Sequence, residues 1–216
     1  MIKLGGSLAG SPLLAHWLGA IAAGGGRAVL VPGGGGFADA VRDAQRRWRF
    51  GDAAAHRMAL LAMEQYGLML AAMEPRLSPA ASRHGIRRVL AAGGVPVWLP
   101  SRMLIGRPDI PESWDVTSDS LAAWLAGELG AAGLLLVKSV PMAAGETLAD
   151  LIRAGAVDSL LPRYLRRVPE CRWIEASRHA ELAHALAGGA APGDVVRCGP
   201  PALADRAGTD CDAILA

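Results

Sequence analysis

Lysine is nearly absent from this chain of 216 residues. Lys and Arg together number 22, and only Lys3 and Lys138 are lysines. Arginine carries a flat, forked guanidinium, whereas lysine carries a compact ammonium group on a flexible stem. Where arginine is the ordinary cation, a retained lysine indicates a site that requires a compact, mobile positive charge. Chance codon usage is the alternative explanation.

Cysteine is also scarce, and its spacing gives no metal site. Cys171, Cys198 and Cys211 are the three cysteines, and no two of them form a CxxC pair. The histidines do not stand at metal-ligand spacing from them. We expect no metal held by the protein itself, and we expect three buried free thiols in a reducing compartment.

Long apolar runs, a signal-peptide pattern and a basic stripe are missing as well. Glu64, Gln65 and Glu128 interrupt the longest apolar stretches, which stay short of the ~18 residues that a membrane span needs. No charged segment followed by an apolar one precedes the first expected strand at residues 2–4. The arginines are dispersed and the net charge is +2, so no surface for nucleic acid is indicated. We expect a cytoplasmic protein that binds neither membranes nor nucleic acid.

The residues that are present predict a compact α/β protein. Apolar residues make up 52% of the chain and charged residues 19%, a composition typical of globular domains. Strand patterns cover 2–4, 27–32, 95–100 and 133–140, and helical patterns cover 11–26, 37–49, 52–74, 78–92 and a segment from Thr117, with an irregular loop at 101–116. The segments 148–155, 172–177, 179–189, 195–199 and 212–216 continue the rhythm. This alternation predicts a mainly parallel sheet of six to eight strands with helices on both faces, a three-layer α/β/α sandwich.

The longest predicted helix, 52–74, has a set of residues that recur at helical spacing. Its pattern consists of Met58, Leu61, Ala62, Gln65 and Leu68. No linker rich in Pro or Ser divides the chain. The sequence therefore indicates a single domain over residues 1–216.

Two glycine-rich stretches follow strand patterns and lead into helices. They are Gly5 to Ser7 in "GGS" and Gly33 to Gly36 in "PGGGG". Ligands of parallel α/β sheets bind beyond the carboxyl ends of the strands. Glycines let the backbone approach an anion closely, and helix N-termini attract phosphate. Two such loops with Lys3 beside one of them favour a phosphate site, although each loop alone is also what a tight strand-to-helix turn requires.

Two familiar nucleotide motifs are incomplete here. Gly33, Gly35 and Ala38 satisfy GxGxxA, but the acidic residue that should end the next strand is missing from a helical segment. Lys138 and Ser139 follow Gly133 as in a P-loop, but the glycine before the lysine is absent and the segment reads as a strand. A dinucleotide oxidoreductase thus remains only a distant alternative.

Phosphoryl transfer requires cations that hold and neutralise the moving group in line with its acceptor. Two lysines at neighbouring strand ends would meet this need if a carboxylate oriented them. Asp119 in "TSDS" stands at the start of a predicted helix. Taken alone, Asp119 is equally an acidic residue favoured by the helix dipole.

Together these segments resemble the amino acid kinase family. "KLGGSL" resembles its N-terminal phosphate loop and "VPGGGG" its acceptor loop. "TSDSLAAWLA" resembles its aspartate-bearing helix and "GTDCDAI" its terminal glycine-threonine turn. The four blocks span nearly the whole chain in family order. The resemblance implies the amino acid kinase fold, with an acceptor lobe over about 1–110 and a nucleotide lobe over about 111–216.

The resemblance also implies roles for individual residues. Lys3 would contact the transferring phosphoryl group and Asp119 would orient the lysines. Lys138 would be the second lysine, although the family has no single fixed position for it. The residues implied to hold ATP phosphates are Gly5, Gly6 and Ser7. The residues implied to cradle the acceptor phosphate are Gly33, Gly34, Gly35 and Gly36, with Arg42 either in contact with it or simply on the surface.

Within the family, the acceptor loop lacks the sequence features of the acetylglutamate, uridylate and isopentenyl phosphate kinases. The chain is more similar to a short archaeal and methylotroph branch related to aspartokinases. That branch includes the kinase that converts [5-(aminomethyl)furan-3-yl]methyl phosphate to the diphosphate in methanofuran biosynthesis. This implies an ATP-dependent kinase of a small phosphate monoester. It also implies Mg²⁺ bridged by nucleotide phosphates and a homo-oligomer, dimer or larger.

Three points stay open at this stage. One alternative is a kinase of the same fold that acts on another small acceptor, a carboxylate or an isoprenoid phosphate. The other is a non-catalytic nucleotide-binding or storage protein. The residues that would hold the aminomethyl group are also open. The candidates are Glu64, Asp115 and Asp158, with Trp114 as an aromatic face or as a packing lid.

Overall fold

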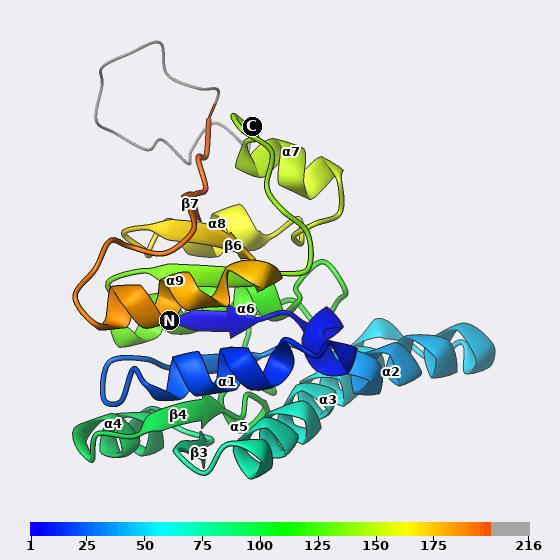
Figure 1. Ribbon diagram of the computed structural model, residues 1–216. Helices are drawn as coiled ribbons and strands as arrows, with labels where there is room; N and C mark the ends of the chain where they lie inside the picture. The colour runs from blue at the N-terminus through cyan, green and yellow to red at the C-terminus, as the bar shows by residue number, and fades with distance from the viewer. Residues whose placement is uncertain (200–216) are drawn as a thin grey trace.

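The computed structural model describes residues 1–199, and these form a seven-stranded sheet with helices on both faces (Figure 1). The strand order is β3-β4-β2-β1-β5-β6-β7. The strands are β1 (Ile2–Leu4), β2 (Leu30–Pro32), β3 (Leu77–Ala80), β4 (Val95–Trp98), β5 (Leu134–Lys138), β6 (Cys171–Glu175) and β7 (Asp194–Val195). All pairs are parallel except β6 with β7. The first strand of the chain thus lies at the centre of the sheet.

Helices connect most of the strands. The α-helices are α1 (Leu14–Ala22), α2 (Gly35–Trp48), α3 (Asp52–Met73), α4 (Arg83–Ala91), α5 (Ser101–Leu104), α6 (Ser118–Leu129), α7 (Leu148–Arg153), α8 (Leu161–Leu165) and α9 (His179–Leu186). Two short 3₁₀ helices are η1 (Gly6–Gly10) and η2 (Ala176–Arg178). No helix in this part of the chain is both long and apolar enough to cross a membrane.

The sheet is buried on both faces because successive strand residues point to opposite sides. On β1, Ile2 and Leu4 pack into the apolar cluster that includes α1 and α9, the two helices in front of the sheet in Figure 1. On β5, Leu134 and Leu136 pack into the cluster that includes α6 and α8. The predicted three-layer α/β/α sandwich is therefore confirmed.

The segment 78–92 was expected to form one helix, and this expectation is wrong. Residues Leu77–Ala80 form β3, and the helix α4 begins only at Arg83. Pro79 cannot donate a ladder hydrogen bond, but β3 lies at the edge of the sheet, where proline is tolerated. Ser82 then caps α4 by accepting a hydrogen bond from Gly85 N at 3.1 Å. Two further short helices, α5 and α8, were not predicted.

The predicted helix 52–74 is confirmed as α3, but most of the residues in its predicted pattern do not face the core. Met58, Leu61, Gln65 and Leu68 are exposed. The buried face carries Ala55, His56, Leu60, Ala62, Met63, Tyr66, Gly67 and Leu70. The helix therefore has apolar residues on two sides, and among the described residues only one of these sides is covered.

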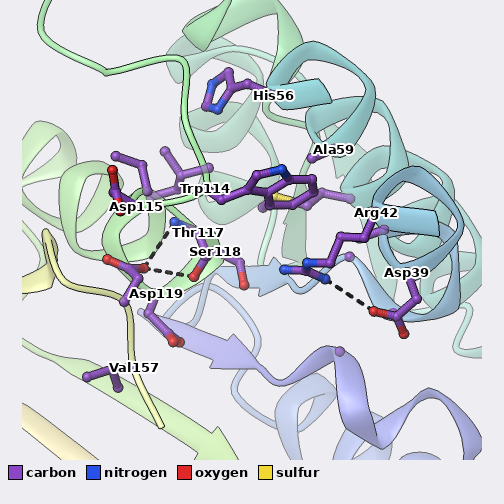
Figure 2. Close-up of a pocket in the computed structure, with 18 of the residues that line it drawn as sticks. Asp39, Arg42, His56, Ala59, Trp114, Asp115, Thr117, Ser118, Asp119 and Val157 are labelled. Carbon is purple, nitrogen blue, oxygen red and sulfur yellow. Dashed lines mark hydrogen bonds and ion pairs between the residues drawn. The ribbon is translucent and has the colours of Figure 1, made fainter. Parts of the chain in front are cut away.

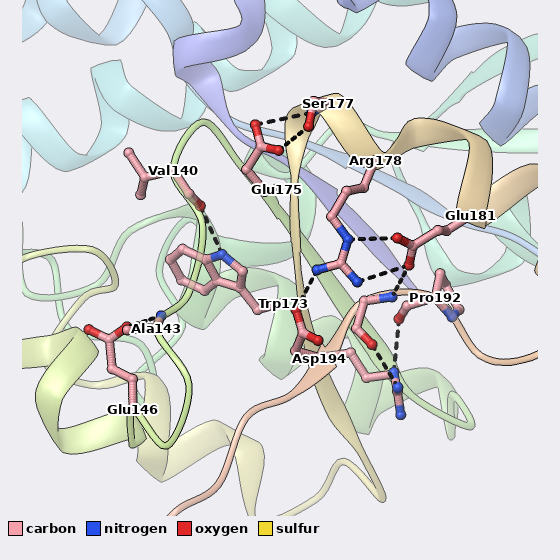
Figure 3. Close-up of polar contacts among 12 residues, drawn as sticks. Val140, Ala143, Glu146, Trp173, Glu175, Ser177, Arg178, Glu181, Pro192 and Asp194 are labelled. Carbon is pink, nitrogen blue, oxygen red and sulfur yellow. Dashed lines mark hydrogen bonds and ion pairs between the residues drawn. The ribbon is translucent and has the colours of Figure 1, made fainter.

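A polar network holds the antiparallel strand β7 beside β6 (Figure 3). Arg178 pairs with Glu181 at 2.6 Å and with Asp194 on β7 at 2.5 Å. Glu181 also accepts from Gly193 N at 3.0 Å, and Arg172 on β6 donates to the Pro192 and Gly193 carbonyls at 2.8 Å. These bonds hold β7 beside β6 although β7 has only two residues.

Two of the cysteines lie within the described residues. Cys171 is a free, buried thiol, as expected. Cys198 is disulfide-bonded, which corrects the expectation of a free thiol there. The "GTDCDAI" stretch and the segment 212–216 lie outside the described residues.

Candidate active site

Three charged side chains from three elements meet at the centre of the sheet. Lys3 Nζ on β1 lies 2.9 Å from Asp119 Oδ1, and Lys138 Nζ on β5 lies 2.7 Å from Asp119 Oδ2. β1 and β5 are adjacent, with Lys3 in register with Leu136. This register places Lys138 just beyond Lys3 toward the carboxyl ends of the strands. The structure thus brings together the three residues that the sequence analysis grouped as catalytic.

Asp119 is the common partner of both ammonium groups because of where α6 begins. Thr117 is the N-cap of α6, so Asp119 falls in the first helical turn. Lys3 and Asp119 retain only 4% and 3% of their surface. Burial alone would raise the pKa of Asp119, but the charges of Lys3 and Lys138 outweigh it and the pKa is lowered. Asp119 is therefore a carboxylate that neutralises part of the charge of two cations.

Lys138 is in a different electrostatic position from a surface lysine. Burial lowers its pKa first, and the neighbouring charge of Lys3 lowers it further, while Asp119 and Asp158 oppose both effects. Its Nζ also donates to the Ala156 carbonyl at 2.5 Å. The ammonium group is thus held in place by Asp119 on one side and by a backbone carbonyl on the other.

Asp158 accepts hydrogen bonds from the start of α6. Its Oδ2 accepts from Thr117 N at 3.1 Å, from Thr117 Oγ1 at 2.7 Å and from Ser120 N at 3.0 Å, and its Oδ1 accepts from Ser120 Oγ. Burial and the charge of Asp119 raise its pKa, against these hydrogen bonds. Both oxygens of Asp158 are thus already hydrogen-bonded to the start of α6.

A cavity of about 510 Å³ opens beside this cluster. Lys138, Asp119 and Asp158 line one part of it, and Lys3 is not among the lining residues. The glycine loops supply Gly6, Ser7, Gly34 and Gly35. A more apolar wall consists of Ala59, Leu60, Met63, Trp114, Val116 and Leu121. The cavity therefore joins a charged end to an end suited to an uncharged organic group.

The two glycine loops contact each other through their backbones. A Cβ on Gly33 would lie 2.5 Å from Gly6 N, and a Cβ on Gly6 would lie 2.6 Å from Gly35 N. Gly35 also has a φ of +53°, which favours glycine. Gly33 and Gly36 do not line the cavity, and Gly5 faces β5 by donating to Val137 O at 3.1 Å. Close packing therefore accounts for Gly33, while Gly34 and Gly35 both border the cavity.

Arg42 on α2 reaches the cavity between Asp39 and Trp114 (Figure 2). Its Nη1 lies 3.1 Å from Asp39 Oδ1, and its guanidinium carbon lies 4.3 Å from the centre of the Trp114 ring. Trp114 is itself oriented by donating from Nε1 to Gln45 Oε1 at 2.7 Å. Arg42 is thus a cavity residue, and one face of Trp114 is already covered by it.

His56 lines the cavity and was not identified from the sequence. It is buried on α3, in the same stretch of helix as Leu60 and Met63. Burial lowers its pKa, against the charge of Glu112 and a hydrogen bond to the Ser113 backbone. Its helical spacing from Leu60 and Met63 was the available signal, but the same spacing is typical of a core face.

The remaining candidates for an amine-binding carboxylate separate clearly. Glu64 does not line the cavity, since it holds Ser101 by accepting from its N at 2.9 Å and from its Oγ at 2.5 Å. Asp115 does line the cavity and is exposed there. In residues 1–199, no group of three or more His, Cys, Asp and Glu side chains is arranged to hold a metal ion.

The chain is similar to known kinases over most of its length. It is 24% identical over 193 residues to the [5-(aminomethyl)furan-3-yl]methyl phosphate kinase of Methanocaldococcus jannaschii, with 84% of this chain and 89% of that protein covered. Its fold is similar to the uridylate kinase of Archaeoglobus fulgidus, with a TM-score of 0.65, 15% identity, and 90% and 99% of the two chains covered.

Two more solved structures share the fold. An isopentenyl phosphate kinase has a TM-score of 0.57 and 16% identity, with 90% of this chain and 98% of that chain covered. The UMP kinase of Bacillus anthracis has a TM-score of 0.60 and 16% identity, with 90% and 92% covered. The sequence model of the amino acid kinase family matches residues 1–142. This match covers more than half of the chain, and the adjacent strands β1 and β5 carry the paired lysines. The chain therefore belongs to the amino acid kinase family.

Proposed function

We propose that this kinase transfers the γ-phosphoryl group of ATP to the phosphate of [5-(aminomethyl)furan-3-yl]methyl phosphate and so forms the diphosphate. The observation that carries the proposal is the Lys3–Asp119–Lys138 cluster at a cavity bordered by two glycine loops. The acceptor is proposed from the Methanocaldococcus jannaschii relative, which bears the name of that kinase.

The reaction requires stabilisation of the charge that moves between two phosphate groups. A phosphate oxygen of the acceptor forms a bond to the γ-phosphorus, the bond from that phosphorus to the β,γ-bridging oxygen breaks, and ADP leaves. Lys138 borders the cavity and would contact the transferring group, while Lys3 would add positive charge from the other oxygen of Asp119. Preorganised charges of this kind lower the barrier because they need not reorient during the reaction.

The loop from Gly5 to Ser7 is proposed to hold the phosphates of ATP. Gly6 and Ser7 border the cavity at the end of β1, where glycine permits close approach. Mg²⁺ would be held by the nucleotide phosphates, because Asp119 and Asp158 already use their oxygens for lysines, hydroxyls and amides. When bound, the ion would neutralise phosphate charge.

The acceptor is proposed to bind against α2 and α3, in the lobe over about 1–110. Its phosphate would lie near Gly34, Gly35 and Arg42, all of which border the cavity. Its furan ring would lie on the apolar wall that includes Met63 and Trp114. Of the two exposed carboxylates that line the cavity, Asp39 is paired with Arg42, so Asp115 is proposed to bind the aminomethyl group.

A panel of acceptors tests the proposal directly. The protein with Mg-ATP is incubated with the aminomethylfuran phosphate, uridylate or isopentenyl phosphate, and the products are identified by ³¹P NMR and mass spectrometry. We expect the diphosphate of the furan compound at the highest kcat/KM, and no product with Asp119→Asn. Faster phosphorylation of uridylate or isopentenyl phosphate would overturn the acceptor, and ADP formation that ignores all acceptors would overturn the reaction.

A further inference from the structure

We propose that Asp158 is a positioning residue that joins the start of α6 to the segment holding Lys138, so that Asp119 and Lys138 keep one fixed arrangement. Nothing in the proposed reaction assigns Asp158 a role. Its effect on turnover rests on the proposed function, but its effect on Lys138 does not.

Asp158 takes over the capping of α6. The N-cap Thr117 makes no side-chain capping bond of its own, because its Oγ1 donates to Asp158 at 2.7 Å. Asp158 instead accepts from Thr117 N and Ser120 N, amides of the first turn that no helical carbonyl satisfies. A carboxylate 38 to 41 residues further along the chain thus fixes the turn that carries Asp119.

The same segment also holds Lys138. The Ala156 carbonyl, two residues before Asp158, accepts from Lys138 Nζ at 2.5 Å. Lys138 Nζ is bound in turn to Asp119 on α6 at 2.7 Å. A closed circuit therefore runs from Lys138 through Asp119 and α6 to Asp158 and back through Ala156.

Charged groups around Lys138 also shift its pKa, in addition to the hydrogen bonds that hold it in place. Lys3 faces it from β1, Asp119 from α6 and Asp158 from the segment after α7. On β6 the Trp173 ring lies 5.4 Å from Lys138 Nζ, and Glu175, in register with Lys138, accepts hydrogen bonds from Ser177. The pKa of the Cys171 thiol is raised to about 12 by burial. Asp158 is thus one of two carboxylates that raise the pKa of Lys138 against burial and against the charge of Lys3.

The scarcity of lysine makes the test specific. Trace acetylation with acetic anhydride, followed by mass spectrometry, reports separately on the amines of Lys3, Lys138 and the N-terminus without any substrate. Since only a neutral amine reacts, Asp158→Asn should raise the acetylation rate of Lys138 near pH 8 by about three- to tenfold. The rate at Lys3 should change less.

Asp150→Asn is the matched control. Asp150 caps α7 by accepting from Thr147 N at 2.9 Å and Thr147 Oγ1 at 2.6 Å, the same types of bond that Asp158 makes. The groups that affect its pKa are Thr147 and Arg153, with no lysine among them. We expect this variant to leave the acetylation of Lys138 unchanged. An unchanged rate in Asp158→Asn, or an equal rise in both variants, would overturn the proposal.

Thr117→Val keeps the inference testable if Asp158→Asn does not fold. This variant removes one hydroxyl donor and leaves every carboxylate in place. We expect faster amide hydrogen exchange over residues 155–158 together with faster acetylation of Lys138. If neither rate changes, the circuit does not hold Lys138.

Kinetics supply the separate arm that depends on the proposed reaction. In Asp158→Asn, kcat should decline toward high pH earlier than in the parent, whereas Asp150→Asn should keep the parent profile. Asp158→Glu, which restores the charge, should return the profile toward that of the parent. If the parent protein shows no turnover, that result would count against the proposed function. The acetylation result would still decide the role of Asp158.

Discussion

Lys3 stands in the central strand of the sheet, where a charged side chain is costly unless it is paired. Its side chain points away from Ile2 and Leu4 and meets Asp119 at 2.9 Å. Asp119 in turn is shared with Lys138, so one carboxylate serves two ammonium groups. The cluster thus keeps excess positive charge next to the cavity, where phosphate would be attracted.

Asp119→Asn is expected to remove activity and stability together. Two buried ammonium groups would lose their counterion, which costs about 3–5 kcal/mol. The pKa of Asp119 is lowered from its ordinary 3.8, so its contribution is complete above that pH and is lost as the pH falls through the folded-state pKa. Urea unfolding of parent and variant should therefore show a stability gap that is largest at neutral pH and narrows in acid. A gap independent of pH would show that the charge of Asp119 is not what stabilises the fold.

Lys3→Arg tests the need for a compact ammonium. Arginine keeps the charge but needs more room, and the Lys3 side chain is only 5% exposed. We expect ATP affinity to stay within a few fold and kcat to fall at least ~100-fold, because the broader guanidinium would displace Asp119 and with it Lys138, which borders the cavity, at a cost of about 2.7–4 kcal/mol of transition-state stabilisation. Lys138→Arg should have the same sign and a smaller effect, because that side chain borders the cavity. If Lys3→Arg turns over near the parent rate in stopped-flow measurements, codon usage would explain the scarcity of lysine.

Arg42→Ala should weaken acceptor binding selectively. Loss of a charged hydrogen bond to phosphate costs about 1–3 kcal/mol, which would appear as a higher acceptor KM with little change in the KM for ATP. Arg46→Ala is the control on the same helix. It is paired with Asp43 at the same i,i+3 spacing as Arg42 with Asp39, and it does not line the cavity. Equal acceptor KM values for Arg42→Ala and Arg46→Ala would show that Arg42 does not contact the acceptor.

At the scale of elements, the start of α2 is positioned by the contact between the two glycine loops. A Cβ on Gly33 would lie 2.5 Å from Gly6 N and 2.9 Å from Gly6 Cα, so Gly33→Ala should separate the loops. We expect lower thermal stability and weaker binding of both ATP and acceptor. Gly36→Ala is the comparison, because its Cβ meets nothing within 4 Å and a helical alanine is favoured by up to about 1 kcal/mol. If calorimetry gives the same thermal stability and the same ligand affinities for Gly33→Ala and Gly36→Ala, Gly33 does not hold the two loops together.

The helix α3 presents a largely apolar stripe that no element within residues 1–199 covers. Met58, Leu61, Gln65 and Leu68 recur at spacings of three and four residues along its exposed side, the pattern of a helix that packs against another. We expect the stripe to pack against α3 of a second copy, in agreement with the predicted homo-oligomer.

Leu61→Glu should therefore give a smaller particle by analytical ultracentrifugation. The control is Ile105→Glu, at a residue of equal 46% exposure outside α3, which should leave the mass unchanged. A parent protein that is monomeric at high concentration would contradict the expectation outright.

At the scale of the whole molecule, the sequence predicted most of the helices and strands, because hydrophobic periodicity and turn residues determine them locally. The helices α2, α3 and α6 and the parallel strands follow from hydrophobic periodicity, and the glycine loops follow from their place after strands. The segment 78–92 was misassigned because its apolar residues also suit an edge strand, and only the sheet order shows that Pro79 lies at an edge.

The site was predictable where the resemblance supplied distant partners. The pairing of Lys3 with Asp119 joins residues far apart in the sequence, and no periodicity indicates it. The bonds from Thr117 and Ser120 to Asp158 had no such guide, so Asp158 was considered as a ligand for an amine. His56 was missed because a cavity wall and a core face share the same helical spacing.

The central place of β1 has a consequence for how the chain folds. One neighbour, β2, follows within about thirty residues, but the other, β5, includes Leu135, whose amide donates to Met1 O. During synthesis one edge of the first strand must therefore stay unpaired until well over half of the chain has left the ribosome. Such long-range pairing slows folding and leaves apolar strand edges accessible to other chains. The geometry that gathers the two lysines thus leaves one edge of β1 open to other chains until β5 has been synthesised.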